Sequence, residues 1–262
     1  PVAVKLAEDR WWISIADSDL LYWVRATAHG WRLDVLVDEP DVSPLAVQGP
    51  KADALMARVF GDSVNDIRFF RFGHFDFQGR DMVVARSGYS KQGGFEIYVE
   101  GSDIGMDLWN ALMEAGRDLD VHAGCPNLIE RIEGGLLSYG NDMTDDNTPH
   151  ECGLGRFCNT HTAIGCVGRD ALLRVAKEGP VQQIRALEIE GDAVPGCKDW
   201  WPVLSEKGRK VGRVSSAAWS PDHKTNVAIG MVKLTHWDEG DEVEIVTPDG
   251  PRKAIVHEAF WA

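Results

Sequence analysis

Residues 86–100 have the sequence RSGYSKQGGFEIYVE, in which a glycine-rich turn is followed by an alternating pattern. The glycines permit a tight chain reversal and a close approach of the backbone to a ligand. From Phe95 to Glu100 apolar and polar residues alternate, which predicts a half-buried strand. With Val83–Ala85 as the preceding strand, the stretch is predicted to form a β-hairpin.

The polar face of this hairpin is a candidate ligand site. Glu96 and Tyr98 alternate with apolar residues and therefore share one face of the strand, close to the turn. Tyr89, within the turn, is placed to lean over the same space. A carboxylate, two aromatic rings and open backbone suit a flat ligand that is rich in hydrogen-bond donors. An ordinary hairpin whose polar face meets water is the alternative, and the pattern alone leaves both open.

Outward from the hairpin, strand and helix patterns alternate up to about residue 175, which predicts an α+β region. Beyond it, short strand patterns separated by Gly, Pro and Asp turns predict a small antiparallel β-barrel. We therefore expect two domains, residues 1–175 and 176–262. The expected strands of the first domain are 2–6, 11–15, 33–37 and 67–72, and its expected helices are 19–29 (capped by Asp17 or Ser18), 51–59, 103–114, 125–132 and a short one within 165–175.

Composition narrows the class of protein. The chain has 262 residues, of which 44% are hydrophobic and 26% charged, as in soluble globular proteins. Its net charge of −14 repels phosphate backbones, so we expect no nucleic-acid partner. No apolar run approaches the roughly 20 residues of a membrane span. The five cysteines are odd in number and lack CxxC spacing, which favours free thiols in a reducing cytoplasm.

The N-terminus begins at Pro1 without an initiator Met and opens directly on a strand pattern. It lacks the basic-then-apolar layout of a signal peptide. We therefore expect the chain to be a fragment whose upstream part is missing, and we expect reduced activity from the fragment alone.

Several kinds of site are not supported. The segment Ser87–Ser90 is only loosely similar to the GxSxG motif of a nucleophile elbow, so a hydrolase is not expected. The spacing of Cys152, Cys158 and His161 matches no usual zinc framework, and we expect no metal site. No phosphate-binding glycine motif of the Walker A or GxGxxG type occurs.

The segment Glu130–Glu133 carries a second candidate. On a helix, Glu130 and Glu133 share a face while Arg131 points elsewhere. A buried Arg131 would be able to clamp a carboxylate with its planar fork. A solvated helix face is the alternative and stays open.

Taken in order, these motifs resemble the glycine-cleavage T-protein (aminomethyltransferase) family. RSGYSKQGGFEIYVE is similar to that family's folate-site hairpin, which typically has the sequence RTGYTGEDGFEI. The flanking segments LAVQGPKA, RIEGGLLSYGNDM, VGRDAL and VGRVSSAAWSPDHKTNVAIGMV occur in the family's order along the whole chain. The resemblance implies a folate-binding region with ferredoxin-like α/β layers and a C-terminal barrel.

Departures from the aminomethyltransferase pattern point to another branch of the family. Ala16 stands where T-proteins usually have Asn, and Lys91-Gln92 replaces an acidic pair. The family's catalytic Asp would fall before Pro1, so no catalytic residue is assigned. SGYSKQGGFEIYVE and AGCPNLIERIEGGLLSYGND are most similar to the branch that demethylates dimethylsulfoniopropionate, with tetrahydrofolate as methyl acceptor and 5-methyltetrahydrofolate and 3-(methylthio)propanoate as products.

The resemblance also implies roles for particular residues. Glu96 is expected to accept hydrogen bonds from the pterin, with Tyr98 and Tyr89 lining the pterin and substrate pocket. Lys91 is a candidate for the substrate carboxylate, although a solvated lysine is the alternative. Arg131 matches the Arg of the family's RLE motif and is expected to bind the cofactor or to fix the domain junction.

A sulfonium donor fits simple chemistry. It carries a good thioether leaving group, so methyl transfer needs no general acid, and the protein mainly holds donor and acceptor together and excludes water. An aromatic wall would bind the cation by about 0.5–2 kcal/mol per ring. An aminomethyltransferase, an aromatic methoxy demethylase and a non-catalytic folate-binding protein of the iron–sulfur assembly type remain alternatives. A homodimer is left open, and no membrane partner is expected.

Overall fold

The computed structural model describes residues 2–15, 19–162 and 165–261. The described residues do not include the predicted helix caps Asp17 and Ser18, or Ala16, which stands where T-proteins usually have Asn. The chain divides into two compact units: Pro1–Gly88 with Gln92–Gly124, and Tyr89–Lys91 with Cys125–Ala262. The expected boundary between residues 175 and 176 does not coincide with this division and stays a prediction.

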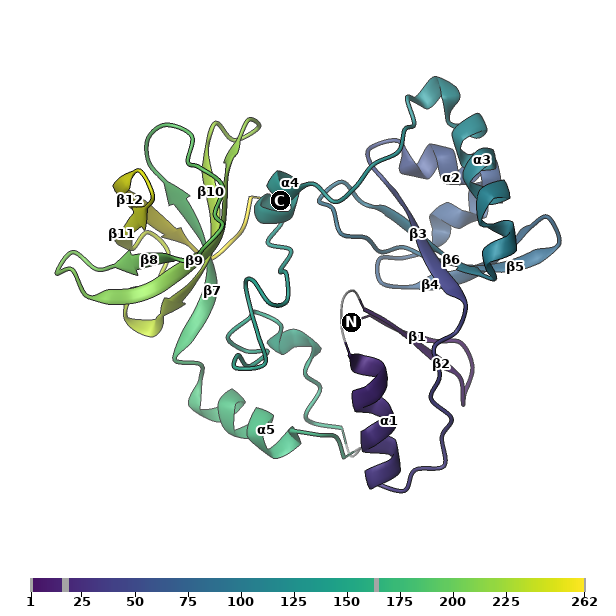
Figure 1. Ribbon diagram of the computed structural model, residues 1–262, viewed down its shortest axis with the longest axis horizontal. Helices are drawn as coiled ribbons and strands as arrows, with labels where there is room; N and C mark the ends of the chain where they lie inside the picture. Colours follow the sequence, from purple (N-terminus) through teal and green to yellow (C-terminus); the bar gives the residue numbers. More distant parts are fainter. Residues whose placement is uncertain (1, 16–18, 163–164, 262) are drawn as a thin grey trace. The chain divides into compact units, whose positions relative to one another are not determined.

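The first unit is built on a four-stranded antiparallel sheet with the order β3-β6-β5-β4 (Figure 1). A separate two-stranded hairpin, β1-β2, precedes it, so the predicted hairpin at the start of the chain is confirmed. Its strands and α-helices are β1 (Val2–Lys5), β2 (Trp11–Ser14), α1 (Leu20–Gly30), β3 (Val42–Gln48), α2 (Ala52–Phe60), β4 (Phe72–Phe77), β5 (Arg80–Ala85), β6 (Gly94–Glu100) and α3 (Gly105–Ala115). Three short 3-10 helices complete it: η1 (Asp62–Asp66), η2 (Ser102–Ile104) and η3 (Arg117–Leu119).

Two hydrophobic clusters cover opposite faces of the sheet. The larger cluster joins α2 and α3 to the strand residues Phe95, Ile97 and Val99. The smaller cluster packs β1 and Trp12 against Tyr98 and its neighbours on β5. Alternation along β6 therefore sends its apolar residues to the helices and its polar residues to the other face, as predicted.

Two strand predictions in this unit are wrong. Residues 33–37 form no strand, and the strand lies instead at Val42–Gln48. Pro44 is tolerated there because β3 is an edge strand of the sheet. Residues 67–71 form a turn in which Phe70 has a φ of +54°, so the strand begins only at Phe72.

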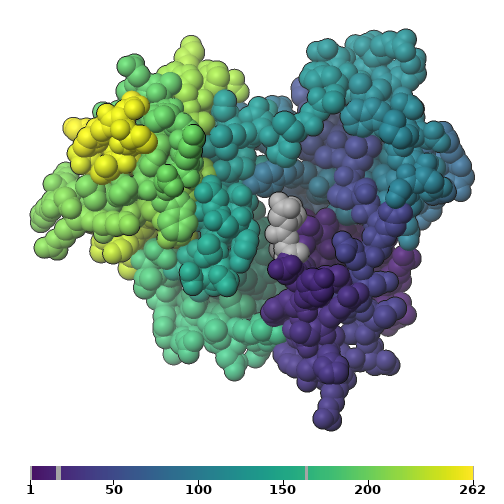
Figure 2. All heavy atoms as spheres, viewed as in Figure 1, coloured from purple at the N-terminus to yellow at the C-terminus, as the bar shows by residue number. Residues whose placement is uncertain are grey.

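The second unit contains a closed six-stranded antiparallel barrel with the order β10-β7-β12-β11-β8-β9. In Figure 2 its residues, coloured green to yellow, pack as one dense body. The predicted C-terminal barrel is confirmed, although the short strand β8 is not apparent from the sequence. Its elements are α4 (Leu128–Glu133), η4 (Gly155–Phe157), α5 (Arg169–Glu178), β7 (Gln182–Ile189), β8 (Trp201–Leu204), β9 (Lys210–Ser220), β10 (Thr225–Lys233), η5 (Leu234–His236), β11 (Glu242–Thr247) and β12 (Gly250–His257).

Two further observations concern the chain as a whole. Among the described residues, no helix combines the length and the apolar character needed to cross a bilayer. All five cysteines are free thiols.

Candidate functional site

Strands β5 and β6 form the predicted antiparallel hairpin. Val83 pairs with Tyr98 and Ala85 with Glu96, so both candidate residues lie on the face that is turned away from α2 and α3. Gln48 of the neighbouring strand β3 ties the two ends of the loop together. Its amide Nε2 donates to the carbonyl oxygens of Ser87 and Phe95, each at 3.1 Å.

The loop ends where only glycine fits. Gly94 has a φ of +145°, and a Cβ atom there would lie 2.2 Å from the carbonyl oxygen of Val47. A side chain would therefore push β3 and β6 apart. The glycine-rich sequence of the turn serves strand approach as well as chain reversal.

Glu96 is half-buried and already oriented by one hydrogen bond. The Ser87 hydroxyl, which is itself buried, donates to the Oε2 atom of Glu96. A carboxylate has about four acceptor positions, so this contact leaves capacity for further donors. Ser87 is a site residue that the sequence analysis did not assign.

Tyr98 is almost fully enclosed, with 3% of its surface exposed. Its ring lies 6.0 Å from that of Trp12, at an angle of 31°. Burial raises the pKa of the Tyr98 phenol, the nearby Glu96 carboxylate raises it further, and the Ser14 hydroxyl opposes them. No hydrogen bond of good geometry reaches the Tyr98 hydroxyl from the described residues. The phenol therefore stays neutral and has unused hydrogen-bonding capacity.

Tyr89 and Lys91 belong to the second unit. The Tyr89 hydroxyl lies 3.0 Å from the carbonyl oxygens of both Leu136 and Leu137, so it donates its one proton to either. Burial raises the pKa of Tyr89, while the positive charge of Arg131 acts in the opposite direction.

Lys91 is held by two carboxylates rather than by water. Its ammonium forms an ion pair with Glu133, of which 1% is exposed, and a weaker one with Asp222 at 3.3 Å. The hydrogen bond to Glu133 raises the pKa of Lys91. The other oxygen of Glu133 accepts a hydrogen bond from Ser220 of β9 at 2.6 Å. The positive charge of Lys91 is therefore already compensated within the second unit.

Arg131 binds a carboxylate of the same chain, Asp142, through one guanidinium nitrogen and not through the two-pronged fork that was expected. Arg131 is 7% exposed and Asp142 is fully buried, with Nη1 and Oδ2 2.6 Å apart. Asp142 also accepts hydrogen bonds from the Ser138 backbone and from the hydroxyls of Ser215 and Ser216, at 2.6–2.8 Å. The other arm of Arg131 donates to Ser216 on β9. This Arg131–Asp142 network joins α4 and the loop after it to the barrel wall.

The five predicted site residues thus fall into two groups. Glu96 and Tyr98 lie together in the first unit, and Tyr89, Lys91 and Arg131 lie in the second. The sequence analysis assigned no role to Asp142, although it belongs to the YGND segment that carried the resemblance. Among the described residues, no His, Cys, Asp and Glu side chains gather into a group that could hold a metal ion.

Comparisons with known proteins agree with this architecture. The family model "GCVT N-terminal domain" matches residues 1–162, and "Glycine cleavage T-protein C-terminal barrel domain" matches residues 182–261. The chain is 61% identical over 261 residues to the dimethylsulfoniopropionate demethylase DmdA of Ruegeria pomeroyi. It is 28% identical over 238 residues to an aminomethyltransferase of Caldanaerobacter subterraneus. The chain spans 71% of the length of the first relative and 62% of the second.

A solved structure shares the fold. The aminomethyltransferase T of the glycine cleavage system from Bartonella henselae matches with a TM-score of 0.74 at 24% sequence identity. The match covers 92% of this chain and 66% of that one.

Proposed function

This chain belongs to the glycine cleavage T-protein family, and from that membership we propose that it transfers a methyl group from dimethylsulfoniopropionate to tetrahydrofolate. The products are 5-methyltetrahydrofolate and 3-(methylthio)propanoate. The observation that carries the proposal is the 61% identity to the Ruegeria pomeroyi demethylase, against 28% to an aminomethyltransferase.

The reaction balances without a redox partner. The bond between the sulfonium sulfur and its methyl carbon breaks, and its electron pair stays on sulfur as a thioether. The lone pair of folate N5 forms the new bond to carbon, and the N5 proton leaves to solvent. Since the leaving group is neutral, the chain needs no acid to protonate it and acts mainly through positioning and exclusion of water.

Glu96 is the residue proposed to accept hydrogen bonds from the N–H groups of the pterin. Its support is the half-buried position of the carboxylate and the hydrogen bond from Ser87, the one donor to it that the described residues supply. A fixed acceptor beside a buried ring system suits an aromatic ligand rich in donors. Tyr98 is proposed to face the donor and the pterin, and its neighbour Trp12 adds a second ring to the same wall.

Tyr89, Lys91 and Arg131 are proposed as supporting residues of the site. Lys91 forms ion pairs with Glu133 and Asp222, and Arg131 forms one with Asp142. These pairs support a role in holding the turn and the loop after α4. Their direct contact with folate or with the substrate carboxylate stays a prediction. A homodimer and a cytoplasmic location likewise stay predictions.

The test is a donor comparison with tetrahydrofolate as acceptor. The protein is incubated with dimethylsulfoniopropionate or with an aminomethyl donor, and folate products are separated by mass spectrometry. We expect 5-methyltetrahydrofolate and 3-(methylthio)propanoate in equal amounts from the first donor. Formation of 5,10-methylenetetrahydrofolate from the aminomethyl donor would refute the proposal. Folate binding without turnover of either donor would indicate a non-catalytic folate-binding protein.

A further inference from the structure

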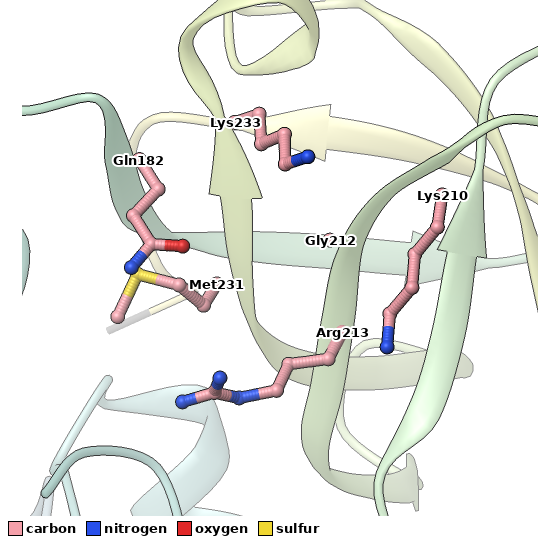
Figure 3. A pocket seen from close by; sticks show the side chains of 6 residues that line it. All are labelled: Gln182, Lys210, Gly212, Arg213, Met231 and Lys233. Carbon is pink, nitrogen blue, oxygen red and sulfur yellow. The ribbon is translucent and has the colours of Figure 1, made fainter. Parts of the chain in front are cut away.

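One end of the barrel carries a pocket that the proposed methyl transfer does not use. It has a volume of about 180 Å³ and lies where β7, β9 and β10 run side by side. The residues that line it, all labelled in Figure 3, are Gln182, Lys210, Gly212, Arg213, Met231 and Lys233. Three of the six are cationic and none is acidic.

The concentration of positive charge is unusual for this chain. With 41 acidic residues against 27 basic ones, carboxylates are plentiful, and many lysines and arginines elsewhere are paired with them. Within the part of the chain that the structure describes, Lys210, Arg213 and Lys233 form no ion pair. Among the described residues, no carboxylate therefore lies in direct contact with these three charges to compensate them.

Backbone geometry brings the cations to one place. Lys210 and Arg213 are three residues apart on β9, and in a regular strand they would point to opposite faces. Between them β9 has an extra residue, because Gly212 pairs with Val203 while Lys210 pairs with Leu204. This β-bulge re-aims the strand, so both side chains line the same pocket. Lys233 joins them from β10, where it pairs with Gln182 of β7.

Arg213 is fixed in place and incompletely satisfied. Its guanidinium lies 4.0 Å from the ring centroid of Trp200, whose indole N–H donates to the Asn141 carbonyl at 3.0 Å. The buried Nε of Arg213 has no hydrogen-bond partner among the described residues. A buried donor without an acceptor costs free energy, and a bound acceptor removes that cost.

We propose that this pocket binds a small oxyanion with two or more negative charges, phosphate or a short dicarboxylate. The planar fork of Arg213 suits two oxygens of such a group, and the two lysines supply point charges. The volume is below the roughly 300 Å³ of pockets for drug-sized ligands, so the site takes a small anion or the end of a larger one.

The experiment is a titration of the ¹⁵N-labelled protein with phosphate, and separately with succinate, at constant ionic strength. The Arg213 Nε–H signal is the readout, assigned by its loss in Arg213→Gln. We expect the signal to shift saturably with anion concentration. Lys233→Gln is expected to weaken the affinity for the anion by about tenfold. The matched control, Lys253→Gln, replaces an exposed lysine of β12 outside the pocket and is expected to leave the affinity unchanged.

The tighter of the two anions identifies the ligand chemistry. The absence of a saturable shift with both anions would overturn the proposal. Equal weakening by Lys233→Gln and Lys253→Gln would also overturn it, because it would show diffuse attraction to the barrel surface. Lys233 is exposed at the end of its strand, so its variant keeps the test valid even where Arg213→Gln does not fold. The readout is binding alone and is independent of methyl transfer.

Discussion

Replacing Asp142 by Asn tests the buried network of the second unit. The fully buried Asp142 carboxylate accepts four hydrogen bonds, and one of them comes from the buried Arg131. Asn has the same shape but no charge, and its NH₂ group faces donors rather than acceptors. The guanidinium of Arg131 would then be buried without a counter-ion. Breaking a buried ion pair in this way costs about 3–5 kcal/mol.

The matched control is Asp222→Asn, which removes the exposed partner of Lys91. The side chain of Asp222 is 71% exposed and 3.3 Å from the ammonium, so its loss should cost less than about 1 kcal/mol. Urea unfolding, followed by far-UV circular dichroism, measures both changes. A fall of about 1 M or more in the unfolding midpoint is expected for Asp142→Asn alone.

Two units need not unfold together, so hydrogen exchange of β9 peptides assigns the effect to the second unit. We expect protection of β9 to fall in Asp142→Asn and to stay unchanged in Asp222→Asn. Equal midpoints and equal exchange in the two variants would refute the assignment of Arg131 and Asp142 as an essential buried pair.

Four further predictions address the hairpin and the thiols. Glu96→Ala should weaken tetrahydrofolate binding by about 1–3 kcal/mol in calorimetry, whereas Glu100→Ala, at the exposed end of β6, should not; equal affinities would remove Glu96 from the site. Gly94→Ala should lower the thermal midpoint, because the added Cβ would lie 2.2 Å from a backbone oxygen, and an unchanged midpoint would contradict this. Burial raises the pKa of Cys197 to about 11, so a maleimide should label the exposed Cys125 before the half-buried Cys197 in peptide mapping. The same shift means that the unfolded state releases its Cys197 proton first, so stability falls as pH rises from about 9 to 11, and a flat unfolding profile there would count against it.

The sequence predicted those features that depend on local periodicity. Alternation from Phe95 to Glu100 gave both the strand and the face on which Glu96 and Tyr98 lie. The other barrel strands were recognisable because each strand pattern lies between turns that contain Gly, Pro or Asp, whereas the four residues of Trp201–Leu204 were too few to stand out. Composition did not predict strand β3, which contains Pro44, because its position is decided by pairing with β6 at the edge of the sheet.

The ion-pair partners of charged side chains could not be predicted from the sequence. Arg131 was expected to hold a carboxylate, but nothing in the spacing identified Asp142, which lies in the loop beyond α4. The alternation pattern placed Lys91 in a turn without indicating Glu133, because their contact depends on long-range packing. The extra residue in β9 that brings Lys210 and Arg213 to one pocket is likewise visible only in strand register.

The membership of Tyr89–Lys91 in the second unit has a consequence for how the protein can be divided. The chain passes from one unit to the other after Gly88, after Lys91 and after Gly124. One cut after Gly124 would leave the three-residue tip with the first fragment and remove it from Glu133, Leu136 and Leu137. The two units therefore cannot be exchanged between homologues by a single crossover after Gly124. A recombinant would keep these contacts only if the hairpin tip and α4 came from the same parent.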